Sequence, residues 1–174
     1  MTRLLVCGSR DWPGTWEDIA THLPEPPAVI IHGACSRTSV RGRAKCEVSV
    51  DMLADFAARG LGMTVLPFPV DHAIDGPWPA AGPRRNARML RESAPTCGLA
   101  FGPLWFAVVC GVCGGDDGGR TECRKCNSTG RSRWKHTGTG GMVALMLAAG
   151  LPVRWIASPD APAVDLVAMP EPPR

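Results

Sequence analysis

Short apolar runs alternate with amphipathic segments along most of the chain. The apolar runs have the length of buried strands, and they cover residues 3–8, 28–33, 62–68, 97–102 and 151–156. Between them, apolar positions recur at helical spacing at residues 15–23, 50–60, 82–93 and 138–150. This alternation predicts an α/β fold, a doubly wound parallel sheet of about five strands with crossover helices.

The glycine-containing loops of this pattern are the first candidates for a binding site. They read GSR at 8–10, HGACS at 32–36, AAGPRRN at 80–86 and TGTGG at 137–141. Ligands of an open parallel sheet bind outside the carboxyl ends of the strands, so we expect these loops to converge on one edge. Two of the loops open helices, whose unpaired backbone N–H groups and positive dipole end favour a phosphate group.

Size and composition indicate one globular domain. The chain has 174 residues, of which 45% are hydrophobic and 20% are charged, and this length can bury a core without disulfides or metal. The N-terminal apolar run is too short for a secretory signal, and no run approaches the length of a membrane span. We therefore expect a cytoplasmic protein with no membrane partner, whose cysteines are thiols or metal ligands.

The formal net charge is only +3, but the basic residues are clustered. They gather at residues 37–47, 84–91 and 120–135. Such clusters favour an anionic partner, a nucleotide phosphate or a nucleic acid, if the fold brings them together, and otherwise they are solvated loops. The proline-rich tail at 158–174 is expected either to add a short edge strand at 164–167 or to stay mobile.

Several of these segments together resemble a known family. They are VCGSRDW (6–12), IIHGACS (30–36), VDMLA (50–54), GPWPAAGPRRNARML (76–90), LAFG (99–102) and GTGGMVALMLAAGLPV (138–153). They are similar to the SLOG superfamily of Rossmann-like nucleotide-binding domains, and specifically to its YspA-type branch. The resemblance implies that residues 1–157 form a Rossmann-like domain that binds a nucleotide or a nucleotide-derived small molecule. Relatives often self-associate, so a homo-oligomer is a further expectation.

The resemblance also implies site residues in each edge loop. It assigns Gly8, Ser9 and Arg10 to the first loop, Gly33 and Asp51 to the second, Gly82, Arg85 and Asn86 to the third, and Gly138 and Thr139 to the fourth. Glycines let the backbone approach a phosphate, and arginines can hold it through paired N–H groups. The carboxylate and the amide of this set are suited to ribose hydroxyls or base edges.

Whether the ligand is processed or only bound is left open by the sequence. Related phosphoribohydrolases of the superfamily carry a Gly-Gly-x-Gly-Thr-x-x-Glu pattern, and TGTGGMVA at 137–144 has no carboxylate in the place of that glutamate. This favours a protein that senses or sequesters its ligand. The alternative is a nucleotide hydrolase in which Asp51 or Asp11 serves as acid, base or ribose anchor.

A cysteine cluster interrupts the segment between the fourth strand and the last helix. Cys110, Cys113, Cys123 and Cys126 are spaced C-x2-C-x9-C-x2-C, which suits two pairs of thiolates around one tetrahedral zinc ion. CGVCGG and CRKCNSTGR also resemble the cysteine-rich repeats of the DnaJ chaperone family. We expect a structural zinc ribbon inserted at 105–135, with redox-active thiols as the alternative.

The basic residues around the predicted ribbon add a third function to the alternatives. Six lysines and arginines lie between 120 and 135, and Trp134 among them can stack on a base. Single-stranded nucleic acid is therefore an alternative partner, as in the DprA-type branch of SLOG-like proteins. A solvated ribbon surface explains the same charges.

The remaining candidates have simpler interpretations. Cys7 and Cys97 lie in predicted strands and are expected to be small buried hydrophobes. A solvated helix face is the simpler interpretation of Arg84 and Arg88. His32 is expected to cap its strand or to lie at the ligand edge. Trp12 is expected either to pack against the core or to stack on a base.

Overall fold

The computed structural model describes residues 1–10, 12–35, 49–109 and 131–172, and within these ranges the side chains of 106–109 and 131–134 are not described. The main strands are β1 (Thr2–Gly8), β2 (Ala28–His32), β3 (Thr64–Pro67), β4 (Cys97–Phe101), β7 (Val153–Ile156) and β8 (Val164–Leu166). The helices are α1 (Trp16–Ala20), α2 (Val50–Gly60), α3 (His72–Asp75), α4 (Ala81–Ser93) and α5 (Gly138–Ala148). A separate pair of strands consists of β5 (Trp105–Val109) and β6 (Arg131–His136).

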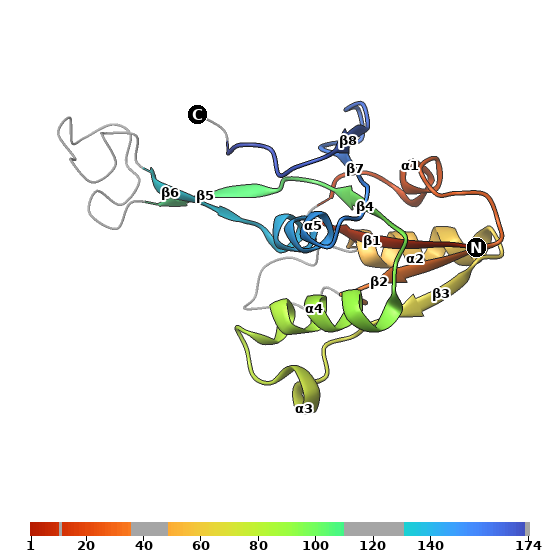
Figure 1. Cartoon of the computed structure of the whole chain (residues 1–174). Coiled ribbons are helices and arrows are strands. Elements are labelled where there is room, and N and C mark those ends of the chain that lie inside the picture. Colours follow the sequence, from red (N-terminus) through yellow and green to blue (C-terminus); the bar gives the residue numbers. More distant parts are fainter. Residues whose placement is uncertain (11, 36–48, 110–130, 173–174) are drawn as a thin grey trace.

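The protein has a mixed α/β architecture around a six-stranded sheet (Figure 1). The strand order is β3-β2-β1-β4-β7-β8, and the pairs from β3 to β7 are all parallel. Only the edge strand β8 runs antiparallel to its neighbour within this sheet. The predicted strands and crossover helices are confirmed, and the arrangement is compatible with a Rossmann-like fold.

Both faces of the sheet are covered, and β1 shows how the sequence achieves this. Its alternate residues point to opposite faces. Leu4 and Val6 pack in a core with α1 and α2, whereas Leu5 and Cys7 pack in a second core with α4 and α5. A strand buried on both faces reads as an unbroken apolar run, which is the pattern of residues 3–8.

Short polar side chains set the start of three helices. Thr15 caps α1 and forms a capping box with Asp18, whose carboxylate accepts the Thr15 N–H at 2.6 Å. Ser49 caps α2 through the Met52 N–H at 3.4 Å, and Thr137 caps α5 through the Gly140 N–H at 2.9 Å. Helix α4 is different, because it begins without a side-chain cap.

The C-terminal segment is partly ordered by the sheet. Of the two outcomes expected for the tail, the edge strand forms, and β8 is the sixth strand beyond the five predicted. Arg154 in β7 pairs with Asp165 in β8, with Nε and Oδ1 2.9 Å apart. Beyond β8, Met169 packs against the core on the α4 and α5 side.

The hairpin of β5 and β6 projects from the body of the molecule on the side where the parallel strands end (Figure 1). Its base is fixed to the rest of the chain. The Trp105 indole N–H donates to the Pro170 carbonyl at 3.0 Å. Within the hairpin, the ring centroids of Trp105 and His136 lie 4.1 Å apart. The segment that carries the four predicted zinc ligands, 110–130, joins the two strands and lies outside the described residues. No helix in the described part of the chain is long and apolar enough to cross a membrane.

Candidate functional site

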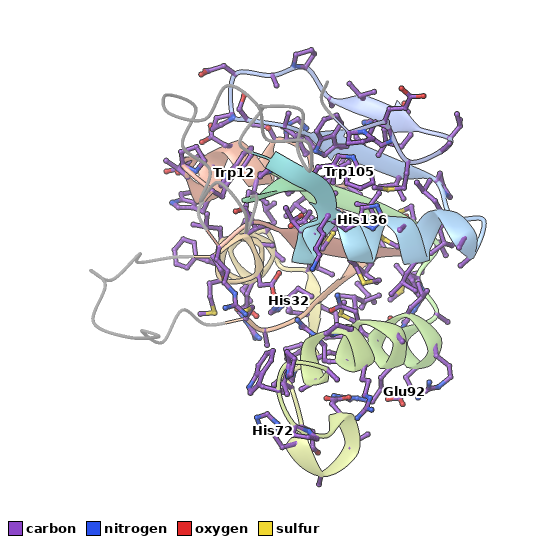
Figure 2. All side chains as sticks on the ribbon, turned by 90° about the vertical axis from the view of Figure 1, so that its left-hand side faces the viewer. Trp12, His32, His72, Glu92, Trp105 and His136 are labelled. Atoms are coloured by element: carbon purple, nitrogen blue, oxygen red, sulfur yellow. The ribbon has the colours of Figure 1, made fainter. Side chains whose placement is uncertain are left out.

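The carboxyl edge of the sheet brings the first loops of the chain together. Figure 2 views the molecule from this edge, with His32 near the centre. The Ser9 N–H donates to the Phe101 carbonyl at 2.9 Å, and the Ser9 carbonyl accepts the Val50 N–H at 3.4 Å. A side chain at Gly8 would place its Cβ 2.5 Å from the Cβ of Val50. The loop after β1 is thus held between β4 and the first turn of α2.

The loop after β2 is held by the buried imidazole of His32. Its Nδ1 accepts the Ala34 N–H at 3.1 Å, so the ring proton lies on Nε2, which contacts Asp55 Oδ1 at 3.1 Å. Arg59 donates to Asp55 at 2.7 Å, and this hydrogen bond is the main reason that the Asp55 pKa is lowered. The expected strand-capping role of His32 is confirmed. Ala34 has a positive φ of 48°, and the bond to His32 stabilises this uncommon conformation.

Asp51 lies next to this loop and is almost entirely removed from water. Its side chain is 6% exposed, and its Oδ2 accepts the Cys35 N–H at 3.0 Å. The Ser49 hydroxyl donates to the Cys35 carbonyl, so both polar backbone groups of Cys35 are engaged. Burial raises the pKa of Asp51, and the Cys35 N–H and the charges of His32, Arg85 and Arg10 oppose that rise.

Arg85 of α4 approaches the same loop from the other face of the sheet. Its guanidinium occupies the place of a side chain at Gly33, where a Cβ would lie 1.6 Å from Nη1. Nη1 donates to the Phe68 carbonyl at 3.0 Å, and Nε is buried without a hydrogen-bond partner. Among the described residues no carboxylate forms an ion pair with Arg85, although its charge acts on Asp51.

The other predicted site residues lie around this centre. Arg10 is exposed and acts on Asp51 through its charge. Gly82 lies in the first turn of α4, where a Cβ would lie 3.3 Å from the Trp78 ring, and Asn86 is half-buried on the same helix. Gly138 and Thr139 lie in the first turn of α5.

In the fourth loop, the cap of α5 is a neighbour of the predicted site residues. Thr139 is only 5% exposed, and the residue whose hydroxyl caps the helix is Thr137. A Cβ at Gly140 would lie 2.0 Å from the Leu104 carbonyl oxygen, so this turn packs tightly against the segment after β4. No described contact joins the turn to Arg85 or Asp51.

The solvated helix face expected for Arg88 needs correction. Arg88 is not on a solvated face: its side chain is only 12% exposed and forms two 2.9 Å bonds to Asp75, whose side chain is 1% exposed. These bonds lower the pKa of Asp75 to about 2. The pair fixes α3 against α4, and Arg88 lies over the Phe68 ring. No sequence pattern predicted this pair, because the four residues of α3 are too few for a periodic pattern.

Cys7 and Trp12 are buried in the core, whereas Cys97 is only partly buried. Cys7 is buried as expected, and burial followed by the Asp51 charge raises the pKa of its thiol. Cys97 is only half-buried, contrary to expectation. Trp12 is 6% exposed and packs edge-on against Phe101 at 5.3 Å, so it is a core residue and not a stacking platform.

The metal and nucleic-acid predictions fall mainly outside the described part of the chain. Cys110, Cys113, Cys123 and Cys126 are not described, nor is Asp11. Within the described residues there is no cluster of His, Cys, Asp and Glu that could hold a metal ion. Of the basic residues around the predicted ribbon, Lys135 is described, and its side chain is exposed.

A groove of about 890 Å³ opens at the opposite, amino edge of the sheet, with Leu4, Cys97 and Arg154 among its lining residues. It shares no residue with the carboxyl-edge cluster. We base the assignment of the site on the charged groups at the carboxyl edge, because volume alone does not indicate a polar ligand. Comparisons with protein-family models, curated proteins and solved structures found no match.

Proposed function

We propose that the chain is a Rossmann-like domain of the SLOG type that senses or sequesters a nucleotide or a nucleotide-derived small molecule. The observation that carries this proposal is the relation of Arg85 and Asp51 at the carboxyl edge. The Arg85 charge acts to lower the pKa of Asp51, yet the two side chains form no direct ion pair. A ligand with an anionic group and hydroxyl donors satisfies both: a phosphate at the guanidinium, and a ribose hydroxyl at the carboxylate.

The backbone of the same edge supports a particular position for the phosphate. The N–H groups of Ala34 and Cys35 already donate to His32 and Asp51, so the loop after β2 has little left to offer an anion. Helices α2 and α5 are capped by Ser49 and Thr137, whereas α4 has no side-chain cap. The Ala81 and Arg84 N–H groups at the start of α4 donate to the carbonyls of Pro77 and Ala80. The start of α4 therefore favours an anion mainly through its dipole, and Arg85 extends from the second turn of this helix.

Structural zinc at Cys110, Cys113, Cys123 and Cys126 is part of the proposal. The antiparallel pairing of β5 with β6 supports it, because the pairing joins the two ends of the cysteine-containing segment. A four-thiolate site has no open coordination position, so the zinc ion would fold the insertion and take no part in chemistry.

A nucleotide hydrolase is the second candidate, and one observation favours it. Burial raises the pKa of Asp51, and a carboxyl group of this kind at a ligand edge is suited to proton transfer. Incubation with nucleoside monophosphates distinguishes the two candidates. A hydrolase releases free base, and Asp51→Asn abolishes the release; a binding protein leaves the nucleotide intact.

The test of binding is a thermal-shift panel of the four nucleoside monophosphates, ADP-ribose and NAD with the full chain. A ligand at a hundred times its Kd adds about 2.7 kcal/mol to the free energy of unfolding, so a shift of several degrees is expected. Arg85→Ala should remove the shift, and Arg91→Ala, at an exposed position on the same helix, should keep it. The proposal fails if no compound shifts the transition, or if the Arg85→Ala variant responds as the unaltered chain does.

A further inference from the structure

Trp78 stands in the segment that joins α3 to α4, and it is 57% exposed. This segment lies on the side of the molecule from which the hairpin of β5 and β6 projects, at the carboxyl edge of the sheet (Figure 1). A single exposed tryptophan on a protein surface is not unusual in itself. Trp78 is different because two contacts hold its ring next to the first turn of α4.

The first contact is with Gly82, in the first turn of α4. A Cβ at Gly82 would lie 3.3 Å from Cζ3 and 3.8 Å from Cη2 of the Trp78 indole, which are two atoms on the outer rim of the ring. A side chain at this position would therefore crowd the indole. The glycine lets the ring lie directly against the helix.

The second contact is with His72, in α3. The centroids of the His72 and Trp78 rings lie 6.0 Å apart, and the ring planes make an angle of 71°, which is an edge-to-face arrangement. His72 is held by its own hydrogen bond, because Nδ1 lies 2.9 Å from the Gly76 carbonyl oxygen. In an edge-to-face pair one ring presents only its rim, so His72 covers at most one face of the indole. At least one face of Trp78 is therefore clear of His72.

The position of Trp78 relates it to the residues of α4 that are proposed to bind the nucleotide. Gly82 shares one face of the helix with Arg85 and Asn86, because residues three and four apart are neighbours on a helix. The indole against Gly82 therefore lies beside the turn that precedes Arg85. The Asn86 side chain forms no hydrogen bond with the described residues, so its N–H groups and its carbonyl oxygen can bond to the edge of a base.

We propose that Trp78 is the platform on which the base of the nucleotide stacks, and that this base is a purine. The inference rests on the proposed function, since the phosphate of the same ligand would bind at Arg85. Every base has a π-face that can stack on an aromatic ring, and the gain increases with the apolar area that the two rings cover. A purine has two fused rings, as indole has, and so it covers more of Trp78 than a single-ring pyrimidine does.

The test is titration calorimetry of the full chain with AMP, CMP and ribose 5-phosphate. The unaltered chain should bind AMP more tightly than CMP. Trp78→Ala should weaken AMP binding about tenfold, the equivalent of about 1.4 kcal/mol, and should leave the affinity for ribose 5-phosphate unchanged, because that ligand has no base. Trp78→Phe should keep most of the AMP affinity, since it keeps an aromatic face.

Trp16→Ala is the matched control. Trp16 is also an exposed tryptophan, at 40%, and it also makes an edge-to-face contact, with its ring centroid 5.4 Å from that of Phe56. It lies at the start of α1 and belongs to none of the predicted binding loops. The AMP affinity of this variant should equal that of the unaltered chain.

Tryptophan fluorescence gives a second readout, because a base stacked on an indole quenches its emission. AMP should quench the unaltered chain and the Trp16→Phe variant, and it should not quench Trp78→Phe. The stacking proposal is overturned if AMP does not bind, if Trp78→Ala binds AMP as tightly as the unaltered chain, or if CMP binds as tightly as AMP. The nucleotide function fails as well only if no compound of the thermal-shift panel binds, so the two proposals can fail separately.

Discussion

The guanidinium of Arg85 lies where a side chain of Gly33 would stand, with Nη1 1.6 Å from the position of the absent Cβ. This contact joins α4 to the loop after β2. It also leaves the guanidinium beside Asp51 without an ion pair among the described residues. The glycine is therefore needed for the position of the arginine and not for a turn, since no positive φ is recorded at Gly33.

Gly33→Ala should displace Arg85 and break its bond to the Phe68 carbonyl. The atoms that must move are the far end of a flexible side chain. We therefore expect a loss of about 1 kcal/mol in the free energy of unfolding, typical of one lost hydrogen bond, together with loss of nucleotide binding. Urea unfolding and the thermal-shift panel measure both effects. Gly60→Ala is the control, because a Cβ there meets no atom within 4 Å. Unchanged binding in Gly33→Ala would mean that the position of Arg85 is not required.

Asp51→Asn should stabilise the protein at neutral pH while weakening ligand binding. The pKa of Asp51 is raised in the folded state, so the folded protein holds the proton more tightly than the unfolded chain does. The free energy of unfolding therefore falls as pH rises from the ordinary aspartate value, about 3.9, through the raised value. An amide keeps an oxygen for the Cys35 N–H, and we expect a gain on the order of 1 kcal/mol at pH 7.

Urea unfolding between pH 4 and pH 8 measures this effect, with Asp160→Asn as an exposed control. The variant at Asp51 should have a flatter pH profile than the unaltered chain. A lower stability at pH 7 would indicate that the carboxylate is an anchor of the loop rather than a group held for a ligand.

Asp75→Asn should have the opposite pH signature. Bonding to Arg88 lowers the Asp75 pKa to about 2, so its contribution is present above the ordinary value of about 3.9 and is lost as pH falls towards 2. At pH 6, Asp75→Asn should have a lower free energy of unfolding than the unaltered chain. As the pH falls, the free energy of unfolding should decrease less in the variant than in the unaltered chain. Asp165→Asn, which breaks an exposed pair with Arg154, should have a smaller effect. If both variants lose the same free energy of unfolding, the buried pair of Arg88 and Asp75 stabilises the protein no more than the exposed pair does.

Metal analysis of the natively purified chain should find about one zinc ion per molecule. Cys113→Ser should lower the zinc content, and Cys97→Ser should not, because Cys97 lies in the main sheet. Absence of zinc, with the four cysteines of 110–126 oxidised as disulfides, would replace the structural-zinc proposal with the redox alternative.

The sequence predicts most of the frame and part of the site. The apolar runs identified β1, β2 and β4 because strands buried on both faces carry apolar residues at every position. Cap residues such as Thr15 gave helix starts, although α1 ends earlier than its apolar positions suggested. Gly33, Asp51 and Arg85 came from the family resemblance, and the structure brings them together.

What the sequence did not predict depends on contacts between distant segments. The bond from Arg85 to the Phe68 carbonyl and the pairing of Arg88 with Asp75 join α4 to the region between β3 and α4, and no local pattern records such pairs. The burial of Thr139 follows from the packing of α5 against the segment after β4. Strands β5 and β6 were missed because the cysteine cluster dominated the interpretation of that region.

Mass spectrometry of the small molecules released when the natively purified chain is denatured tests nucleotide binding most directly. The unaltered protein and Arg91→Ala should release the same phosphate-containing nucleotide derivative, in amounts approaching one per chain. Arg85→Ala should release little or none. Equal release from Arg85→Ala and the unaltered chain, or the absence of any nucleotide derivative from all three, would contradict the assignment of this edge as a nucleotide site.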